Sequence, residues 1–160
     1  MMIKKLGLER WLHLSGTFTL VNREVSSTRK GYLGELEVHK DLLKKGWNIY
    51  VPVVDDHGID LIAQKGIVTY RIQIKSQSFT EWQTRRSSVE VRVRRKSIAN
   101  ILAIPIYLHN CVCYVPVDFS GNMPAHGFFC SLAIKPAKNN QNKNRKWYKD
   151  YVDLPETISL

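Results

Sequence analysis

The segment from residue 59 to residue 75 constrains the fold most, because it predicts two strands joined by a tight turn. From Ile67 to Lys75 apolar and polar residues alternate, and this period of two is typical of a strand with one buried face. Residues Ile59 to Ala63 form the preceding strand, and Gln64-Lys65-Gly66 supplies the turn. We therefore expect an antiparallel hairpin near the middle of the chain.

The polar face of this hairpin carries candidate functional groups. Gln73 and Lys75 lie two residues apart on the second strand and therefore share a face. If the turn is centred at Lys65-Gly66, Asp60 pairs near Arg71 and lies diagonal to Gln73. A carboxylate, an amide and an amine are then expected to lie close together.

A strongly periodic helix is predicted from about Arg29 to Lys45. Ser26-Ser27-Thr28 offers N-cap oxygens, and Gly46 ends the helix. The side expected to be apolar comprises Tyr32, Leu36, Val38, His39, Leu42 and Leu43. Glu35 lies in the middle of that side, where a carboxylate is costly unless it is paired or binds something.

Two glycines, Gly31 and Gly34, flank Glu35 and would let another backbone or a ligand approach the helix closely. A simpler interpretation is that Glu35 reaches solvent from the end of the helix. The two interpretations differ in whether the carboxylate is partly buried.

The rest of the chain predicts further strands, at residues 48–53, 89–93, 98–108, 111–117 and 128–134. The stretch at 98–108 can also be a short helix that runs into a strand. No linker long enough to divide the 160 residues is visible. We therefore expect a single domain over residues 26–160, with residues 1–25 as an N-terminal appendage of unknown role.

The formal net charge is +10, and its distribution is uneven. Residues 85–96 hold six basic groups and one acid, Glu90, whereas residues 135–149 hold six basic groups and no acid. The other 133 residues hold 12 basic and 13 acidic groups, so the excess lies in these two segments. Concentrated positive charge favours a polyanion partner and suits contacts with a phosphate backbone, although such segments can also be solvated loops.

Membrane and secreted proteins are disfavoured. No apolar run approaches the roughly 20 residues needed to span a bilayer, and no cleavage site typical of a signal peptide follows the basic start of the chain. Three cysteines, Cys111, Cys113 and Cys130, cannot all pair internally, which fits a reducing compartment. We therefore expect an intracellular, cytoplasmic protein.

The candidate groups suit one kind of chemistry. Asp60 and Gln73 offer oxygens that Mg²⁺ prefers, the backbone carbonyl of Ile74 lies between them, and Glu35 completes the set directly or through water. Lys75 can hold or deprotonate a water that attacks a phosphorus, and its charge offsets the negative charge that develops. The set makes metal-assisted phosphodiester hydrolysis possible, with Mn²⁺ able to replace Mg²⁺.

These residues resemble the active-site motifs of the PD-(D/E)XK nuclease superfamily. The resemblance spans about residues 27–78 and rests on Lys30-Gly31-Tyr32-Leu33-Gly34-Glu35, Gly58-Ile59-Asp60-Leu61-Ile62-Ala63 and Arg71-Ile72-Gln73-Ile74-Lys75-Ser76. Two positions depart from the usual pattern, because Ile59 replaces a proline and Gln73 replaces an acid. The resemblance implies an α/β (α+β) fold with a restriction-endonuclease-like core, in which a mixed β-sheet is flanked by helices. Because Gln73 lacks the negative charge of the usual acid, we predict weaker metal binding than in a site with Asp or Glu at this position.

The glutamine narrows the resemblance further. The chain resembles the group I intron-encoded homing endonucleases of this fold. The resemblance rests on the Glu-Asp-Gln-x-Lys set, on Val115-Pro116-Val117-Asp118, and on residues 136–141 followed by Asp150-Tyr151. That family implies sequence-specific cleavage of a long double-stranded DNA site by a homo-oligomer, a dimer or a tetramer. The products would carry 5′-phosphate and 3′-hydroxyl ends.

In this interpretation the two basic segments bind DNA, and the protein associates with the nucleoid. Arg92 alternates along a strand and is expected to read bases, whereas the later segment grips phosphates. The candidate DNA-binding residues are Arg85, Arg86, Arg92, Arg94, Arg95, Lys96, Lys138, Lys143, Arg145 and Lys146. Three alternatives stay open: a nuclease similar to Holliday-junction resolvases, a DNA-binding module without catalytic activity, and an inert basic RNA-binding protein.

Other polar residues are assigned structural roles. Asp55-Asp56-His57 is expected to form a turn, and His39 is expected to be a satisfied core histidine. Cys111 and Cys113 lack a second Cys/His pair for a zinc site, so they are expected to be small core residues.

Overall fold

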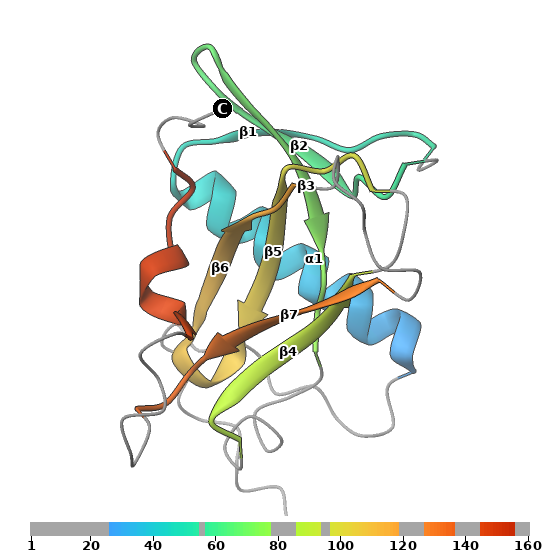
Figure 1. Cartoon of the computed structure of the whole chain (residues 1–160). Coiled ribbons are helices and arrows are strands. Elements are labelled where there is room, and N and C mark those ends of the chain that lie inside the picture. Colours follow the sequence, from blue (N-terminus) through green and yellow to red (C-terminus); the bar gives the residue numbers. More distant parts are fainter. Residues whose placement is uncertain are drawn as a thin grey trace, which may run out of the picture.

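The computed structural model describes residues 26–54, 57–77, 86–93, 97–118, 127–136 and 145–155. In Figure 1 the helix α1 (Ser27–Lys44) lies behind a five-stranded sheet. In spatial order, the strands of this sheet are β1 (Asn48–Tyr50), β2 (Leu61–Lys65), β3 (Val68–Ile74), β5 (Ile101–Ile106) and β6 (Cys111–Pro116). The pair β3–β5 is parallel and the other pairs are antiparallel, which confirms the expected mixed sheet.

A second sheet covers the opposite face of β5 and β6. Its strands, in spatial order, are β4 (Ser88–Val93), β7 (Phe128–Ala133) and β8 (Lys146–Trp147). Figure 1 shows β4 and β7 crossing in front of the first sheet. Two short 3₁₀ helices, η1 (Tyr107–His109) and η2 (Tyr148–Tyr151), complete the elements described. The expected core was a mixed sheet flanked by helices; in the described part of the chain, α1 covers one face of this sheet and the second sheet covers the other face of β5 and β6.

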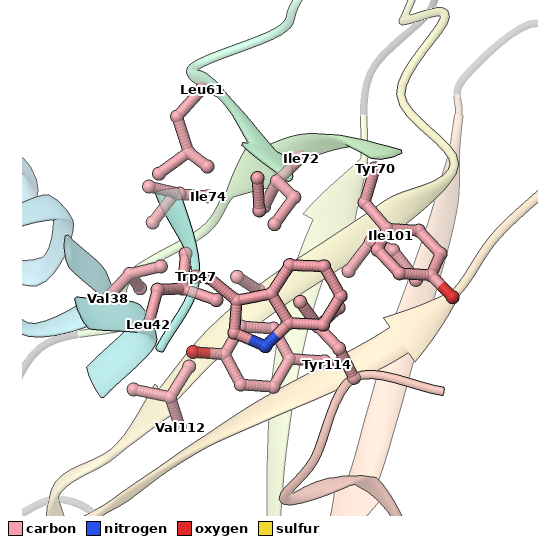
Figure 2. Packing of buried hydrophobic residues seen from close by; sticks show 13 residues of the cluster. Val38, Leu42, Trp47, Leu61, Tyr70, Ile72, Ile74, Ile101, Val112 and Tyr114 are labelled. Carbon is pink, nitrogen blue, oxygen red and sulfur yellow. The ribbon is translucent and has the colours of Figure 1, made fainter. Parts of the chain in front are cut away.

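Strands β5 and β6 separate two hydrophobic cores. Ile101 and Ala103 of β5 point to α1 and join the first core, which Figure 2 shows. Leu102 and Ile104 point the other way and pack against the second sheet. A strand that is buried on both faces must be continuously apolar, which explains why residues 98–108, where a strand was predicted, are nearly all apolar. Pro105 fits within it because the pairing of β5 with β3 ends at Ala103.

Helix α1 begins and ends as predicted, but it buries a different face. The hydroxyl of Ser26 accepts a hydrogen bond from the Arg29 backbone at 3.4 Å, and Gly46 follows the helix with φ +76°. The fully buried positions are Gly34, Val38 and Leu42. Tyr32, Leu36 and Leu43 were expected on the apolar side but are 60%, 42% and 57% exposed. They lie about 120° to 160° around the helix from Val38, outside the stripe that one flat sheet can cover.

The hairpin forms as predicted, with a different register. The two-residue turn is Gly66-Ile67, and Gly66 has φ +60°, as the first central position of a type II′ turn requires. Leu61 therefore pairs with Ile72, which places Asp60 opposite Gln73 rather than near Arg71. This correction brings the two candidate residues closer together than the sequence indicated.

The C-terminal residues pack onto both cores. Tyr148 is buried and stacks on His109 with ring centroids 4.2 Å apart, and Leu154 joins the first core. The Tyr70 hydroxyl donates a hydrogen bond to the Pro155 carbonyl, and the Lys45 amine donates one to the Val152 carbonyl. Part of the basic segment at 135–149 is thus built into the fold as β8 and η2, which the sequence did not predict.

The remaining structural expectations can be compared with the described residues. Cys113 and Cys130 are buried and Cys111 is half-buried, and all three are free thiols, as expected for core cysteines. The first predicted strand is shorter than expected, Asn48–Tyr50. Among the helices of the described ranges, none combines the length and apolar character that a bilayer span requires.

Two neighbouring leucines test the face that α1 buries. Leu42→Ala should cost about 2–5 kcal/mol of unfolding free energy, because it empties a fully buried position. Leu43→Ala should stay within about 0.5 kcal/mol of the wild type, because Leu43 is mostly exposed. Urea denaturation of both variants measures the difference, and equal losses would contradict this placement of the helix.

Candidate active site

Asp60 is anchored across the hairpin where β2 begins. Its backbone N–H donates a hydrogen bond to the Ile72 carbonyl at 2.9 Å. Its carboxylate oxygen Oδ2 accepts a hydrogen bond from the Ile74 backbone N–H at 2.5 Å. The carboxylate is therefore held against the end of β3, beside the Gln73-Ile74-Lys75 segment.

Gln73 is the buried polar residue of β3. Its side chain is 7% exposed, and its Oε1 atom has no hydrogen-bond partner among the described residues. The residues around it leave little room, because a methyl group at Gly58 would lie 3.0 Å from Gln73 Nε2 and 3.2 Å from Ser97 Cβ. A buried amide oxygen without a partner costs about 1–3 kcal/mol, so a native structure that retains one needs a reason.

Lys75 continues the line of β3 beyond its last paired residue. Its backbone N–H donates to the Ala103 carbonyl at 3.0 Å, so the segment stays attached to β5. The Lys75 side chain is half-buried. Because Ser76 packs against α1, the alternation of an extended chain directs Lys75 to the same side as Gln73.

Glu35 of α1 completes the group. Burial raises the pKa of its carboxyl first, and the Asp60 carboxylate raises it further. The charges of His39 and Lys75 act in the opposite direction and lower this pKa. The fold thus brings Glu35, Asp60 and Lys75 within electrostatic reach of one another, and Glu35 is half-buried rather than solvent-directed.

A close contact between α1 and the end of β3 sets the position of Glu35. A Cβ atom at Gly34 would lie 2.4 Å from Ser76 Cβ and 2.6 Å from Ser76 Oγ, so only glycine fits there. The Ser76 hydroxyl is hydrogen-bonded to the Tyr107 hydroxyl at 2.9 Å. The expected close approach therefore occurs at Gly34, whereas a Cβ at Gly31 would meet nothing within 4 Å.

Sequence reasoning missed three residues around the site. Ser76 and Tyr107 support α1, and only the glycine next to Glu35 signalled that something packs there. Gln77 also carries a buried Oε1 without a partner among the described residues. Gln77 continues the alternation of Gln73 and Lys75, and this spacing could have identified it from the sequence.

The donor set contains two carboxylates, an amide oxygen and a backbone carbonyl. No group of three or more histidine, cysteine, aspartate or glutamate side chains suited to a metal occurs within the described ranges. The four donors named above are all oxygen atoms. Oxygen donors around a buried unpartnered amide fit a hard divalent cation.

The basic segments are only partly described. Arg86, Arg92, Arg145 and Lys146 are exposed. The other candidate DNA-binding residues lie outside the described residues, namely Arg85, Arg94, Arg95, Lys96, Lys138 and Lys143. Asp55 and Asp56 also lie outside them, and His57, which follows, is exposed. The guanidinium of Arg92 lies 5.9 Å from the Phe129 ring centroid.

Comparisons with known proteins agree with this geometry. Residues 25–154 match the family model described as PD-(D/E)XK endonuclease. Among solved structures, the chain is similar to a bacterial homing endonuclease, I-Ssp6803I, with a TM-score of 0.56 and 20% identity. The match covers 71% of this chain and 80% of that chain. A search of curated proteins finds no match.

Two glycines of α1 test the contact that positions Glu35. Gly34→Ala should cost about 1–3 kcal/mol, because its methyl group overlaps Ser76, although alanine regains about 1 kcal/mol of helix propensity. Gly31→Ala should gain up to about 1 kcal/mol, because the space beside it is open. Denaturant titration measures both changes. Equal effects at the two positions would argue against the contact.

The pH dependence of stability tests the environment of Glu35. A carboxyl whose pKa is raised in the folded state stabilises the fold below its ordinary pKa of 4.5, and this contribution is lost as pH rises through the folded-state pKa. Glu35→Gln should therefore be more stable than the wild type at pH 7 in EDTA, and the difference should shrink toward pH 4. Glu37→Gln removes a partly buried carboxylate of the same helix, and it should show no such gain because this carboxylate is paired with Lys40 at 3.5 Å.

Proposed function

Because the chain belongs to the PD-(D/E)XK endonuclease family, we propose that it is a metal-dependent DNA endonuclease that uses Glu35, Asp60, Gln73 and Lys75. The observation that carries this proposal is the buried, unpartnered Oε1 of Gln73 opposite the anchored carboxylate of Asp60. A cation bound by this oxygen would offset the free-energy cost of burying it. The placement of Glu35 and Lys75 beside these two groups supports the same site.

The donor set favours Mg²⁺, with Mn²⁺ as a substitute. Asp60, Gln73 and the Ile74 backbone carbonyl would hold the cation, and Glu35 would complete the set directly or through water. A bound divalent cation supplies positive charge that stabilises negative charge developing on the phosphoryl oxygens. Gln73 contributes no charge, so the site should bind Mg²⁺ more weakly than a site with an acid at this position.

Lys75 is the group that acts on the attacking water. Its amine holds the attacking water, either as the neutral base that takes a proton from it or as the ammonium whose charge offsets the negative charge that develops on the pentacoordinate phosphorus. The water oxygen forms a bond to phosphorus, the bond from phosphorus to the 3′ oxygen breaks, and a solvent water protonates the departing 3′ oxygen. The products are a 5′-phosphate and a 3′-hydroxyl.

The substrate we propose is double-stranded DNA with a defined sequence, cleaved as by a homing endonuclease. The exposed Arg86, Arg92, Arg145 and Lys146 give positive charge outside the near-neutral catalytic part of the chain. The similarity to a bacterial homing endonuclease supports a related use of the fold. A chain of 160 residues is small for a long DNA site, so we propose that it acts as a homo-oligomer, a dimer or a tetramer.

Removal of the Lys75 amine tests the proposed chemistry. With a randomised duplex library and Mg²⁺, Lys75→Ala should cleave about 10²–10⁴ times more slowly than the wild type. DNA binding should remain, because the basic segments are unchanged. Lys40→Ala removes an exposed lysine of α1 and should cleave normally.

The same experiment distinguishes the alternatives. EDTA should stop cleavage by the wild type, and equal rates for wild type and Lys75→Ala would contradict the assigned role. Faster cleavage of a four-way junction than of linear duplex would indicate a resolvase-like nuclease. Tight binding with no cleavage in Mg²⁺ or Mn²⁺ would indicate a DNA-binding module without catalytic activity.

A further inference from the structure

The outer face of the β4–β7 ribbon is a polar surface on a rigid support. The two strands pair over six residues each, from Ser88 opposite Ala133 to Val93 opposite Phe128. Inward side chains, Val89, Val91, Val93, Cys130 and Leu132, are buried in the second core. The outward positions are Ser88, Glu90 and Arg92 on β4, and Phe129 and Ser131 on β7.

The free end of this ribbon is two strands wide. β8 pairs only with Leu132 and Ala133, so among the described strands the part that carries Arg92 and Phe129 has no third strand beside it. Paired strands lie about 4.8 Å apart. A two-stranded ribbon of this size fits the major groove of B-DNA, which is about 12 Å wide.

Arg92 is held in place by its cross-strand neighbour. It pairs directly with Phe129, and its guanidinium lies 5.9 Å from the centroid of the phenyl ring. Phe129 is 67% exposed, so its ring lies at the surface beside the guanidinium. The ring thus restricts the guanidinium before any partner binds and reduces the entropy lost when it forms paired hydrogen bonds.

Glu90 is the one acid of the basic segment at 85–96, and it shares this outer face with Arg92. A carboxylate placed against DNA phosphates would weaken binding through repulsion. In the major groove the same carboxylate meets a donor, because the N4 amino group of cytosine points into that groove. Glu90 therefore favours base contacts over phosphate contacts for this face.

The spacing of the two residues matches the spacing of base pairs. Two residues along a strand advance about 6.6–6.8 Å, and two base-pair steps advance about 6.8 Å. Two side chains on one face of a strand lying along the groove can therefore meet base pairs two steps apart. Guanidinium groups prefer guanine, and carboxylates accept from cytosine.

We propose that the outer face of the β4–β7 ribbon enters the major groove of the DNA substrate and reads two base pairs. Arg92 reads a guanine, and Glu90 reads a cytosine in a base pair two steps away. Phe129 holds Arg92 in position and offers an apolar surface to thymine methyl groups. This inference rests on the proposed function, and it assigns specificity to described residues on a different sheet from Asp60, Gln73 and Lys75.

A binding selection from a randomised duplex library, with Ca²⁺ in place of Mg²⁺ and the full chain, tests the inference. Arg92→Gln should lose preference for guanine at one base pair by about 5- to 150-fold, which corresponds to the worth of one base contact. Glu90→Gln should lose preference for cytosine at a base pair two steps away by a similar factor. Arg86→Gln, just outside β4, should weaken binding to all sequences equally and leave the selected motif unchanged.

The outcomes separate this inference from the function on which it rests. A wild type that enriches no sequence overturns the proposed sequence specificity and this inference with it. A wild type that enriches a motif, with Arg92→Gln and Glu90→Gln enriching the same motif, overturns the inference alone. The inference is also overturned if the two variants change base preference at positions that are not two steps apart. It is overturned as well if the variants change the oligomeric state and leave the base preference unchanged. Unchanged thermal melting confirms that both variants fold.

Discussion

The candidate site depends on the contact between Gly34 and Ser76. The hairpin orders Asp60, Gln73 and Lys75 by its own register, but Glu35 belongs to a separate helix and is brought to them by packing alone. A Cβ atom at Gly34 would overlap Ser76, so the glycine sets how near the helix axis comes to β3. The Tyr107 hydroxyl is hydrogen-bonded to Ser76 and would lie 3.4 Å from the same Cβ atom, so the segment after β3 and η1 together limit how near α1 comes.

The site contains unfavourable electrostatic interactions that a bound cation would offset. Two carboxylates, Glu35 and Asp60, repel each other, and the pKa of Glu35 rises as a result of burial and this repulsion. Gln73 adds a buried oxygen without a partner. Each feature lowers the stability of the fold at neutral pH, and each is an oxygen donor of the kind that a hard cation prefers. Neighbouring carboxylates and buried polar atoms without partners are destabilising features that are typical of functional sites.

Local patterns predicted much of the fold, and long-range contacts explain the remainder. The N-cap at Ser26, the alternation of β3 and the position of Glu35 within the buried part of α1 are local features. The register error arose because Gly66 was assigned to the second central position of the turn, whereas its positive φ serves the first. The burial of Gln73 depends on Gly58 and Ser97, which no periodicity reveals. β8 was missed because basic and polar residues surround its two positions.

The division of the molecule into two cores gives the uneven charge of the sequence a structural meaning. The first core supports the near-neutral part that carries Glu35, Asp60, Gln73 and Lys75, and the second supports the β4–β7 ribbon. Strands β5 and β6 contribute alternate side chains to both cores, so neither sheet can shift without disturbing the other. A nuclease of the proposed kind, which would cut at a fixed distance from the bases it reads, would need such rigidity. The shared strands supply it without a linker, because consecutive residues of β5 point to opposite faces and therefore into different cores.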